Sequence, residues 1–128
     1  MRIKKFEDIE AWKVARSLTK DIYTVTSKGP FEKDYGLRDQ IRRASVSIMS
    51  NIAEGYERDG NKEFKQFLST AKGSAGEVKC QLYIAFDVGF ITDDEYKALS
   101  EKVNLVSNLI GGFIRYLNES RLHGRKNS

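Results

Sequence analysis

Residues 37–55, with the sequence LRDQIRRASVSIMSNIAEG, are the stretch that decides the fold. Apolar side chains recur here at steps of three and four residues, which is the spacing of a helix that buries one face. The apolar positions are Leu37, Ile41, Ala44, Ile48 and Ile52. Polar side chains flank this stripe at Arg38, Arg42, Arg43, Ser47, Asn51 and Glu54. The stretch therefore predicts a helix that packs into a core and keeps charged and hydrogen-bonding groups at its sides.

Three other segments repeat this periodicity, so we expect helices over about residues 8–28, 35–56, 62–88 and 93–120. The first helix stops at Gly29 and Pro30, because glycine accepts left-handed backbone and proline cannot continue a helix. No segment alternates with the period of two that a half-buried strand needs. Short connections between long helices predict one all-α domain over residues 1–128, an up-down-up-down antiparallel four-helix bundle.

Polar residues mark the starts of the other three helices. Asp34 is positioned to cap the second helix and Asn61 the third, because short polar side chains accept hydrogen bonds from the free N–H groups of a first turn. Thr92 and Glu95 have the spacing of a capping box. This pair is the clearest local signal for the start of the fourth helix.

The second and fourth helices carry more apolar surface than one core-facing stripe requires. The additional positions are Leu105, Leu109, Gly112 and Tyr116 in the fourth helix and Val46, Met49 and Ala53 in the second. Extra apolar stripes on a small protein indicate contact with another subunit, so we expect a homo-oligomer. The alternative is a monomer whose helices have broad core-facing stripes.

Glycines inside the third and fourth helices are unusual, because each costs about 1 kcal/mol relative to alanine. They are Gly73, Gly76, Gly111 and Gly112. Their spacing matches no phosphate-binding loop. We expect them to allow close approach between helix backbones.

The net charge of +4 is concentrated at the two ends of the chain. Three basic residues lie within residues 1–5 and three within residues 121–128, so residues 6–120 hold 16 of the 22 lysines and arginines and all 18 acidic residues. Basic tails of this kind either contact phosphates or are simply solvated chain ends. The near-neutral body weakens any argument for nucleic-acid binding from net charge alone.

Three basic stripes remain as candidate nucleic-acid-binding surfaces. They comprise Lys13, Arg16 and Lys20 on the first helix; Arg38, Arg42 and Arg43 on the second; and Lys65 and Lys72, continued by Lys79, on the third. The alternative is a set of solvated faces paired with acids such as Asp21 and Glu63. For Asn51, Glu54 and Glu77 we expect polar contacts between helices or subunits, since polar groups at such borders need partners.

The sequence contains no catalytic, metal-binding or cofactor-binding constellation. Its one histidine, His123, and its one cysteine, Cys80, have no partners for zinc ligation or nucleophilic catalysis, and Glu-x-x-His motifs are absent. Cys80 lies among apolar residues of a helical pattern, so we expect a buried, unreactive thiol. We therefore expect a non-enzymatic protein with no metal, no cofactor and no small-molecule substrate.

The N-terminal residues MRIKKFEDIE carry charges where a signal peptide would be apolar. No apolar segment is long enough to cross a bilayer. The use of a single cysteine is in keeping with a reducing compartment. We therefore expect a cytoplasmic protein with no membrane partner.

Three motifs resemble one known family. They are Phe6 with Ile9 and Trp12, QIRRASVSIMSNIAEG at residues 40–55, and FKQFLSTAKGSAGE at residues 64–77 followed by the helix that contains Leu82. Together they cover most of the chain and resemble the small four-helix-bundle proteins encoded within intervening sequences of bacterial 23S rRNA genes. The resemblance implies an up-down bundle that assembles as a ring-shaped homopentamer, an association with RNA, and no enzymatic activity.

A similar bundle serves as the accessory protein of diversity-generating retroelements, where a basic pentamer engages a reverse transcriptase and nucleic acid. The near-neutral body of this chain departs from such strongly basic relatives. Two hypotheses follow. The first is a homo-oligomer, a pentamer as the resemblance implies, that binds RNA or a ribonucleoprotein through clustered arginines and lysines. The second is a structural scaffold that binds a protein partner and no nucleic acid.

Overall fold

The computed structural model describes the backbone of residues 3–122 and the side chains of residues 3–119. In this part of the chain there are helices and no strands, which confirms the all-α prediction. The elements are η1 (Phe6–Asp8), α1 (Glu10–Val25), α2 (Gly29–Lys33), α3 (Tyr35–Tyr56), α4 (Asn61–Asp87) and α5 (Asp93–Leu122). The predicted set of four helices lacked η1 and α2.

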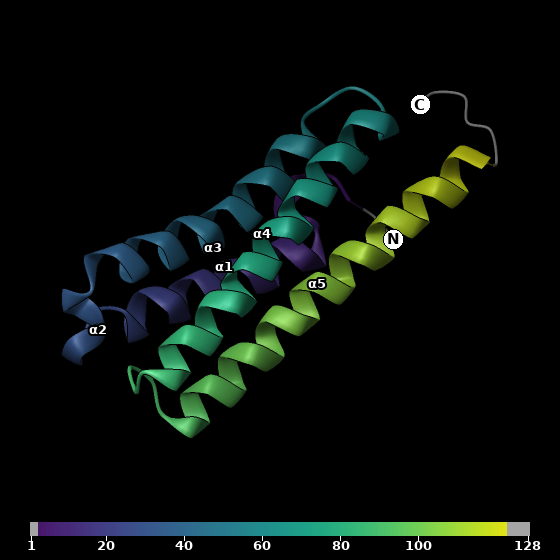
Figure 1. Ribbon diagram of the computed structural model, residues 1–128. Coiled ribbons are helices and arrows are strands. Elements are labelled where there is room, and N and C mark those ends of the chain that lie inside the picture. The colour runs from purple at the N-terminus through teal and green to yellow at the C-terminus, as the bar shows by residue number, and fades with distance from the viewer. Residues whose placement is uncertain (1–2, 123–128) are drawn as a thin grey trace.

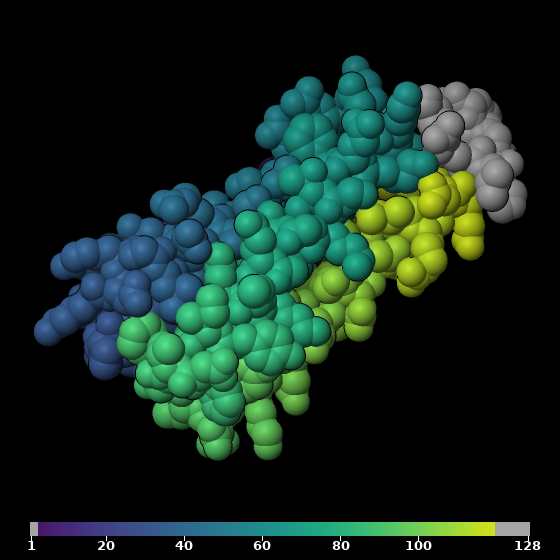
Figure 2. Space-filling view, in the orientation of Figure 1, coloured from purple at the N-terminus to yellow at the C-terminus, as the bar shows by residue number. Residues whose placement is uncertain are grey.

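The four long helices lie side by side and give the molecule an elongated shape (Figures 1 and 2). Helix α3 packs against α4, and α4 packs against α5. Helix α1 packs against both α3 and α5. Each long helix therefore has two long neighbours, which leaves its remaining surface on the outside.

The prediction of one helix over residues 8–28 is wrong at both ends. At the start, the Asp8 carboxylate accepts hydrogen bonds from the backbone N–H groups of Lys4 (3.0 Å) and Lys5 (3.3 Å), which holds a separate 3-10 turn before α1. At the end, the Thr26 hydroxyl donates to the Ile22 carbonyl oxygen at 2.7 Å in the last turn. The Thr26 backbone N–H donates to the same oxygen at 3.0 Å, so this carbonyl accepts the last backbone hydrogen bond of α1 as well as the hydroxyl.

Gly29 and Pro30 begin a helix as well as separating two others. Gly29 has φ of 62°, a left-handed conformation that glycine adopts without strain, and Pro30 occupies the first turn of α2. This short helix presents Phe31, which is fully buried and lies 5.1 Å from the ring of Phe90. The interpretation of the Gly-Pro pair as a simple stop missed α2 and a large core residue.

The capping predictions were confirmed at two of three helix starts. Asp34 Oδ1 accepts from the Leu37 N–H at 3.0 Å and caps α3. The expected cap by Asn61 is wrong, because Asn61 is the first residue of α4 and Gly60, with φ of 91°, precedes it. At α5 the Thr92 hydroxyl accepts from the Glu95 N–H at 3.1 Å, and the Glu95 carboxylate accepts from the Thr92 N–H at 2.9 Å.

Replacing Thr92 with alanine is expected to lower the free energy of unfolding by about 1 kcal/mol, because one N–H of the first turn of α5 loses its acceptor. The Glu95 side chain also binds Lys28 at 2.9 Å, so the same end of the molecule is tied to the α1–α2 connection. Chemical denaturation of Thr92→Ala and Thr92→Ser measures the effect. Serine restores the acceptor, and equal losses in both variants would contradict this role of the hydroxyl.

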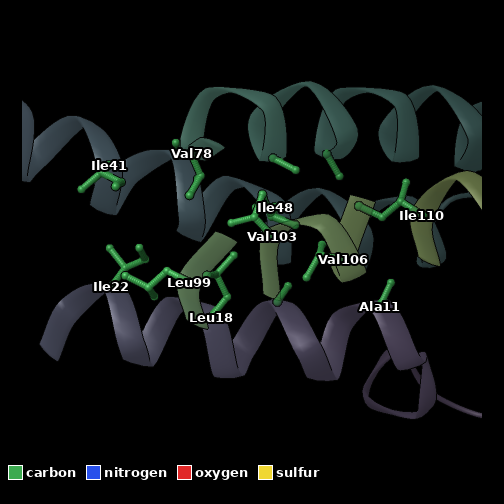
Figure 3. Packing of buried hydrophobic residues seen from close by; sticks show 14 of the residues in the cluster. Ala11, Leu18, Ile22, Ile41, Ile48, Val78, Leu99, Val103, Val106 and Ile110 are labelled. Carbon is green, nitrogen blue, oxygen red and sulfur yellow. The ribbon is translucent and has the colours of Figure 1, made fainter. Parts of the chain in front are cut away.

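The core runs along the length of the molecule between the four long helices. Side chains from α1, α3, α4 and α5 point toward one another, including Ile22, Ile41, Ile48, Val78 and Val103 (Figure 3). The predicted stripe of α3 is buried from Ile41 to Ile52, while Leu37 is only partly buried. Two aromatic residues predicted to lie in the core are less covered than expected: Trp12 is partly buried and Phe86 is exposed.

Two predictions for α4 are wrong. Cys80 is exposed and does not lie in the core. Gly73 and Gly76 do not mediate close approach within the chain, because a Cβ added at either position would meet no atom within 4 Å. The tightly packed helical glycine is Gly55 at the end of α3, where a Cβ would stand 2.8 Å from Phe67 Cβ.

Candidate functional site

The basic residues of α1 lie on its outer surface. Lys13, Arg16 and Lys20 are all exposed, opposite the buried face formed by residues such as Ala15 and Leu18. The Arg16 guanidinium lies 5.7 Å from the centre of the Trp12 ring. The predicted α1 stripe is thus a solvent-facing ridge.

Arg42 points from α3 toward the end of α1. Its Nε donates to Thr26 Oγ1 at 2.8 Å and its Nη2 to Ser27 Oγ at 3.0 Å, while its guanidinium lies 4.5 Å from the centre of the Tyr23 ring. These contacts fix the C-terminal turn of α1 against α3. Arg42 is therefore part of the packing between helices.

Arg38 is also bound within the chain. Its Nη1 donates to the Glu32 carbonyl oxygen and its Nε to Asp39 Oδ1, both at 2.9 Å, and it lies over the Tyr35 ring. The hydrogen bond from Arg38 is the main reason that the pKa of Asp39 is lowered. Arg38 therefore holds α2 against the start of α3.

Arg43 lies on the other side of α3 from Arg42. It lines a polar hollow of about 340 Å³ between α3 and α4, together with Gln40, Ser47, Glu77 and Gln81. The structure therefore does not bring Arg38, Arg42 and Arg43 together into one patch. Consecutive helical residues project about 100° apart, so neighbours in sequence separate in space.

The polar residues predicted to lie at helix borders follow the edge of α3. Asn51 Nδ2 donates to the Ser47 carbonyl oxygen at 2.8 Å and to Ser47 Oγ at 3.0 Å, and Ser47 Oγ is bonded to Ser74 Oγ of α4 at 2.8 Å. Glu54 binds Arg58 at 2.9 Å near the end of α3. Asn51 thus reaches α4 through Ser47.

Lys65 and Lys72 lie on the side of α4 that faces α5. Lys65 Nζ donates to Asn118 Oδ1 at 2.6 Å. Lys72 Cε is 3.6 Å from the position that a Cβ on Gly111 would take. These contacts place both lysines of this pair along the seam between the two helices.

Ion pairs account for few of the candidate cations. Among the described residues, Lys28, Arg38, Arg58 and Lys102 make the ion pairs. Lys13, Lys20, Arg43 and Lys72 take part in none of them. These cations keep their charge available at the surface.

An apolar groove runs between α1 and α5. One end is a hollow of about 470 Å³, and the other is a mainly apolar hollow of about 240 Å³. The larger hollow is lined by Val14, Ala98 and Leu105 and also by the polar residues Glu10, Lys13, Ser17, Glu101 and Lys102. The second hollow is lined by Ile9, Glu10, Ala11, Asn108, Leu109, Gly112, Phe113 and Tyr116. Leu105 is 47% exposed and Tyr116 50% exposed, so part of the second stripe of α5 faces outward and does not enter the core.

The part of the chain that the structure describes contains no group of three or more His, Cys, Asp or Glu residues able to hold a metal ion. His123 lies outside the described residues, as do Arg2, Arg121, Arg125 and Lys126 of the basic tails. None of the described helices combines the length and the apolar composition needed to cross a bilayer. That the protein is not an enzyme stays a prediction.

Residues 7–112 match the family model described as 23S rRNA-intervening sequence protein. This match spans most of the chain and includes the motifs at residues 40–55 and 64–77. The chain belongs to this family. The membership confirms the resemblance inferred from the sequence. The family description gives no biochemical role, so the role is inferred from the surface of the molecule.

A solved structure has the same fold. It is the crystal structure of a protein of unknown function from the S23 ribosomal protein family of Bacteroides thetaiotaomicron VPI-5482. The two chains are 20% identical and superpose with a TM-score of 0.75 over 81% of this chain and 97% of the other. No curated protein matches this chain. The likeness therefore supports the fold alone.

Sequence reasoning missed two kinds of surface residue. Neither Tyr83 nor Phe86 was predicted to be a surface residue, and they are 50% and 36% exposed. Arg115 was not among the predicted site residues, and its Nη1 lies 3.7 Å from the Cβ position of Gly111, beside Lys72. Only the packing of α4 on α5 brings these residues together.

Proposed function

We propose that this 23S rRNA-intervening sequence protein is a non-catalytic, homo-oligomeric scaffold that binds RNA through basic residues on its outer helices. Its four long helices form an up-down-up-down antiparallel bundle within a single domain, since short connections make consecutive helices antiparallel. Such a protein works in the cytoplasm, where RNA partners of this kind are found. The assembly is a pentamer, in keeping with the family resemblance.

The uncovered apolar groove between α1 and α5 is the observation that carries the proposal. A buried leucine or aromatic side chain stabilises a structure by about 1.5–3 kcal/mol relative to an exposed one. Leu105 and Tyr116 are half exposed in the single chain, so covering each of them gains about half of this energy. A second copy of the chain brings exposed apolar side chains of its own, which makes it the natural cover.

A second apolar surface lies at a different place, where α4 ends and α5 begins. Its exposed members are Ile84 and Val88, which lie four residues apart on one face, whereas Tyr83 and Phe86 lie against Tyr96 of α5. Contacts between two different surfaces of identical chains are heterologous, and they produce closed rings when the rotation between copies closes. Two separate apolar surfaces therefore favour a ring over a twofold dimer.

The RNA part of the proposal draws on the exposed cations and on the family. Lys20 and Lys72 have no ion-pair partner among the described residues and do not line the groove, so their charges are free to bind phosphates. The description of the family names 23S rRNA. Repetition of these cations around an oligomer multiplies each weak phosphate contact.

The second candidate function is a scaffold that binds a protein partner and no nucleic acid. It is favoured by the contacts of Arg38 and Arg42, which use two predicted phosphate-binding arginines for packing within the chain. Lys65 is similarly bonded to Asn118. The two candidates make opposite predictions for RNA binding.

Affinity for a labelled RNA that has both a stem and single-stranded flanks is expected to fall steeply as salt rises, because phosphate binding releases counterions. The measurement is a titration followed by fluorescence anisotropy at several salt concentrations. Absence of binding at low salt would reject the RNA function and favour the protein scaffold.

A further inference from the structure

The seam between α4 and α5 combines three lysines at regular spacing. Lys65, Lys72 and Lys79 recur every seven residues on α4, which places them about 10 Å apart along one side of the helix. Lys65 is bonded to Asn118 of α5, and Lys72 lies against Gly111 of the same helix. The charge of Lys79 acts on Tyr96, near the start of α5. Lys65 and Lys72 therefore line the seam between α4 and α5, and Lys79 lies seven residues further along the same side of α4.

A fourth cation joins the middle of this row. Arg115 Nη1 and Lys72 Cε lie 3.7 Å and 3.6 Å from the Cβ position of Gly111, so two positive side chains converge over one residue of α5. Because Gly111 has no side chain, the space between it and the two cations stays open. Like charges that converge without a carboxylate between them attract an anion.

Three acidic residues of α4 and α5 face away from the seam. Glu77 lines the hollow on the α3 side of α4, and Glu101 lines the groove on the α1 side of α5. Glu95 is occupied by Lys28 and the Thr92 N–H. The α5 residues next to Lys65 and Lys72 at this seam are uncharged or basic, namely Asn118, Gly111 and Arg115.

Aromatic side chains lie at one end of the seam between α4 and α5. Tyr83 lies beyond Lys79 on α4, and its ring centre is 5.8 Å from that of Tyr96, which stacks on Phe86 at 4.5 Å. Partial burial is the main cause that raises the pKa of Tyr96, and a hydrogen bond with the Tyr83 side chain adds to it. The Tyr83 ring is thus supported by its neighbours and still half exposed.

We propose that this seam binds single-stranded RNA, with the sugar-phosphate backbone along Lys65, Lys72, Lys79 and Arg115 and a base stacked on Tyr83. Aromatic rings stack on bases that are not already paired and stacked within a duplex. Lysines in a row follow the phosphates without reading sequence. This inference rests on the proposed RNA-binding function and names the site and the form of RNA.

The seam is compatible with self-association. The apolar groove lies on the α1 side of α5, whereas Lys72, Gly111 and Asn118 lie on its α4 side. A copy seated in the groove therefore leaves the seam open. Ring assembly places several seams in one particle.

The test measures binding of a labelled, unpaired RNA of about 12 nucleotides, within the range of site sizes for single-strand binders. Four phosphate contacts predict a slope of about −3 for log affinity against log salt. Lys72→Ala and Lys79→Ala are each expected to make this slope shallower by about 0.7. Tyr83→Leu is expected to weaken binding about tenfold, while Tyr83→Phe keeps the ring and the affinity.

The matched control removes two exposed basic residues of α1 that do not line the groove, Arg16→Ala with Lys20→Ala, and is expected to retain most of the affinity. A duplex of the same length is expected to bind more weakly than the single strand and to be insensitive to Tyr83→Leu. If the α1 pair abolishes binding and the seam variants do not, the seam is rejected while the RNA function stands. If the unaltered protein binds neither RNA, both proposals fail.

Discussion

Leu105→Glu is expected to convert the assembled protein into single chains. Leu105 lines the larger hollow of the groove between α1 and α5 and is 47% exposed, so the proposed interface covers it while the core does not. Removing a carboxylate from water in such an interface is costly, and Lys13 and Lys102 in the same lining offset only part of that cost. A net cost of about 3 kcal/mol weakens association about a hundredfold. Sedimentation equilibrium of the variant and the unaltered protein measures the change.

Asn104→Glu is the matched control for this prediction. Asn104 precedes Leu105 on α5, is exposed, and does not line the groove. It adds the same charge to the same helix and is expected to leave the assembly intact. If Leu105→Glu and the unaltered protein have equal masses, and circular dichroism shows that both are folded, the groove is not part of the interface.

Gly55→Ala is expected to lower the free energy of unfolding by about 1–3 kcal/mol, because the added methyl group overfills a packed contact. Its Cβ would stand 2.8 Å from Phe67 Cβ, 2.9 Å from Phe64 Cδ1 and 3.3 Å from the Phe64 carbonyl oxygen. Phe67 Cβ is attached directly to the α4 backbone and cannot move without shifting that helix. Denaturant titration gives the change in stability.

Gly73→Ala in α4 is expected to have the opposite effect on the free energy of unfolding. A Cβ at Gly73 meets no atom within 4 Å, and alanine favours the helix over glycine by about 1 kcal/mol. This variant is expected to be more stable than the unaltered protein. Loss of stability in Gly73→Ala equal to that in Gly55→Ala would show that the cost is not specific to the contact with Phe67.

Structural features that depend only on residues close together in the chain could be predicted from the sequence. The burial of Ile41, Ile48 and Ile52 follows from helical periodicity, and the capping box of Thr92 and Glu95 follows from a spacing of three residues. Both depend on the geometry of one helix. The all-α fold could be predicted for the same reason.

Features that depend on contacts between distant segments were not predictable. Phe31 is buried because α2 folds back onto Phe90, and Gly55 matters because α4 crosses it closely. A sequence shows where its glycines are, but it does not show whether another helix packs closely against them. The same limit led to the wrong predictions for Cys80 and Gly73.

The sequence predicts individual residues of the candidate site, but it does not predict which of them come together in space. The seven-residue spacing of Lys65, Lys72 and Lys79 is visible in the sequence and was recognised as a stripe. Arg115, about 40 residues further along the chain, joins Lys72 only through the packing of α5 on α4. Conversely, Arg42 and Arg43 look like one cluster in the sequence, and the helix turns them toward α1 and α4 respectively.

The central claim is that copies of this chain cover the groove between α1 and α5. Its most direct test is the mass of the purified protein in solution over a wide range of concentrations. We expect a multiple of the 14.6 kDa chain, with five copies as the predicted number, that persists on dilution to micromolar concentration. A single chain at the highest concentration that remains in solution would contradict the account.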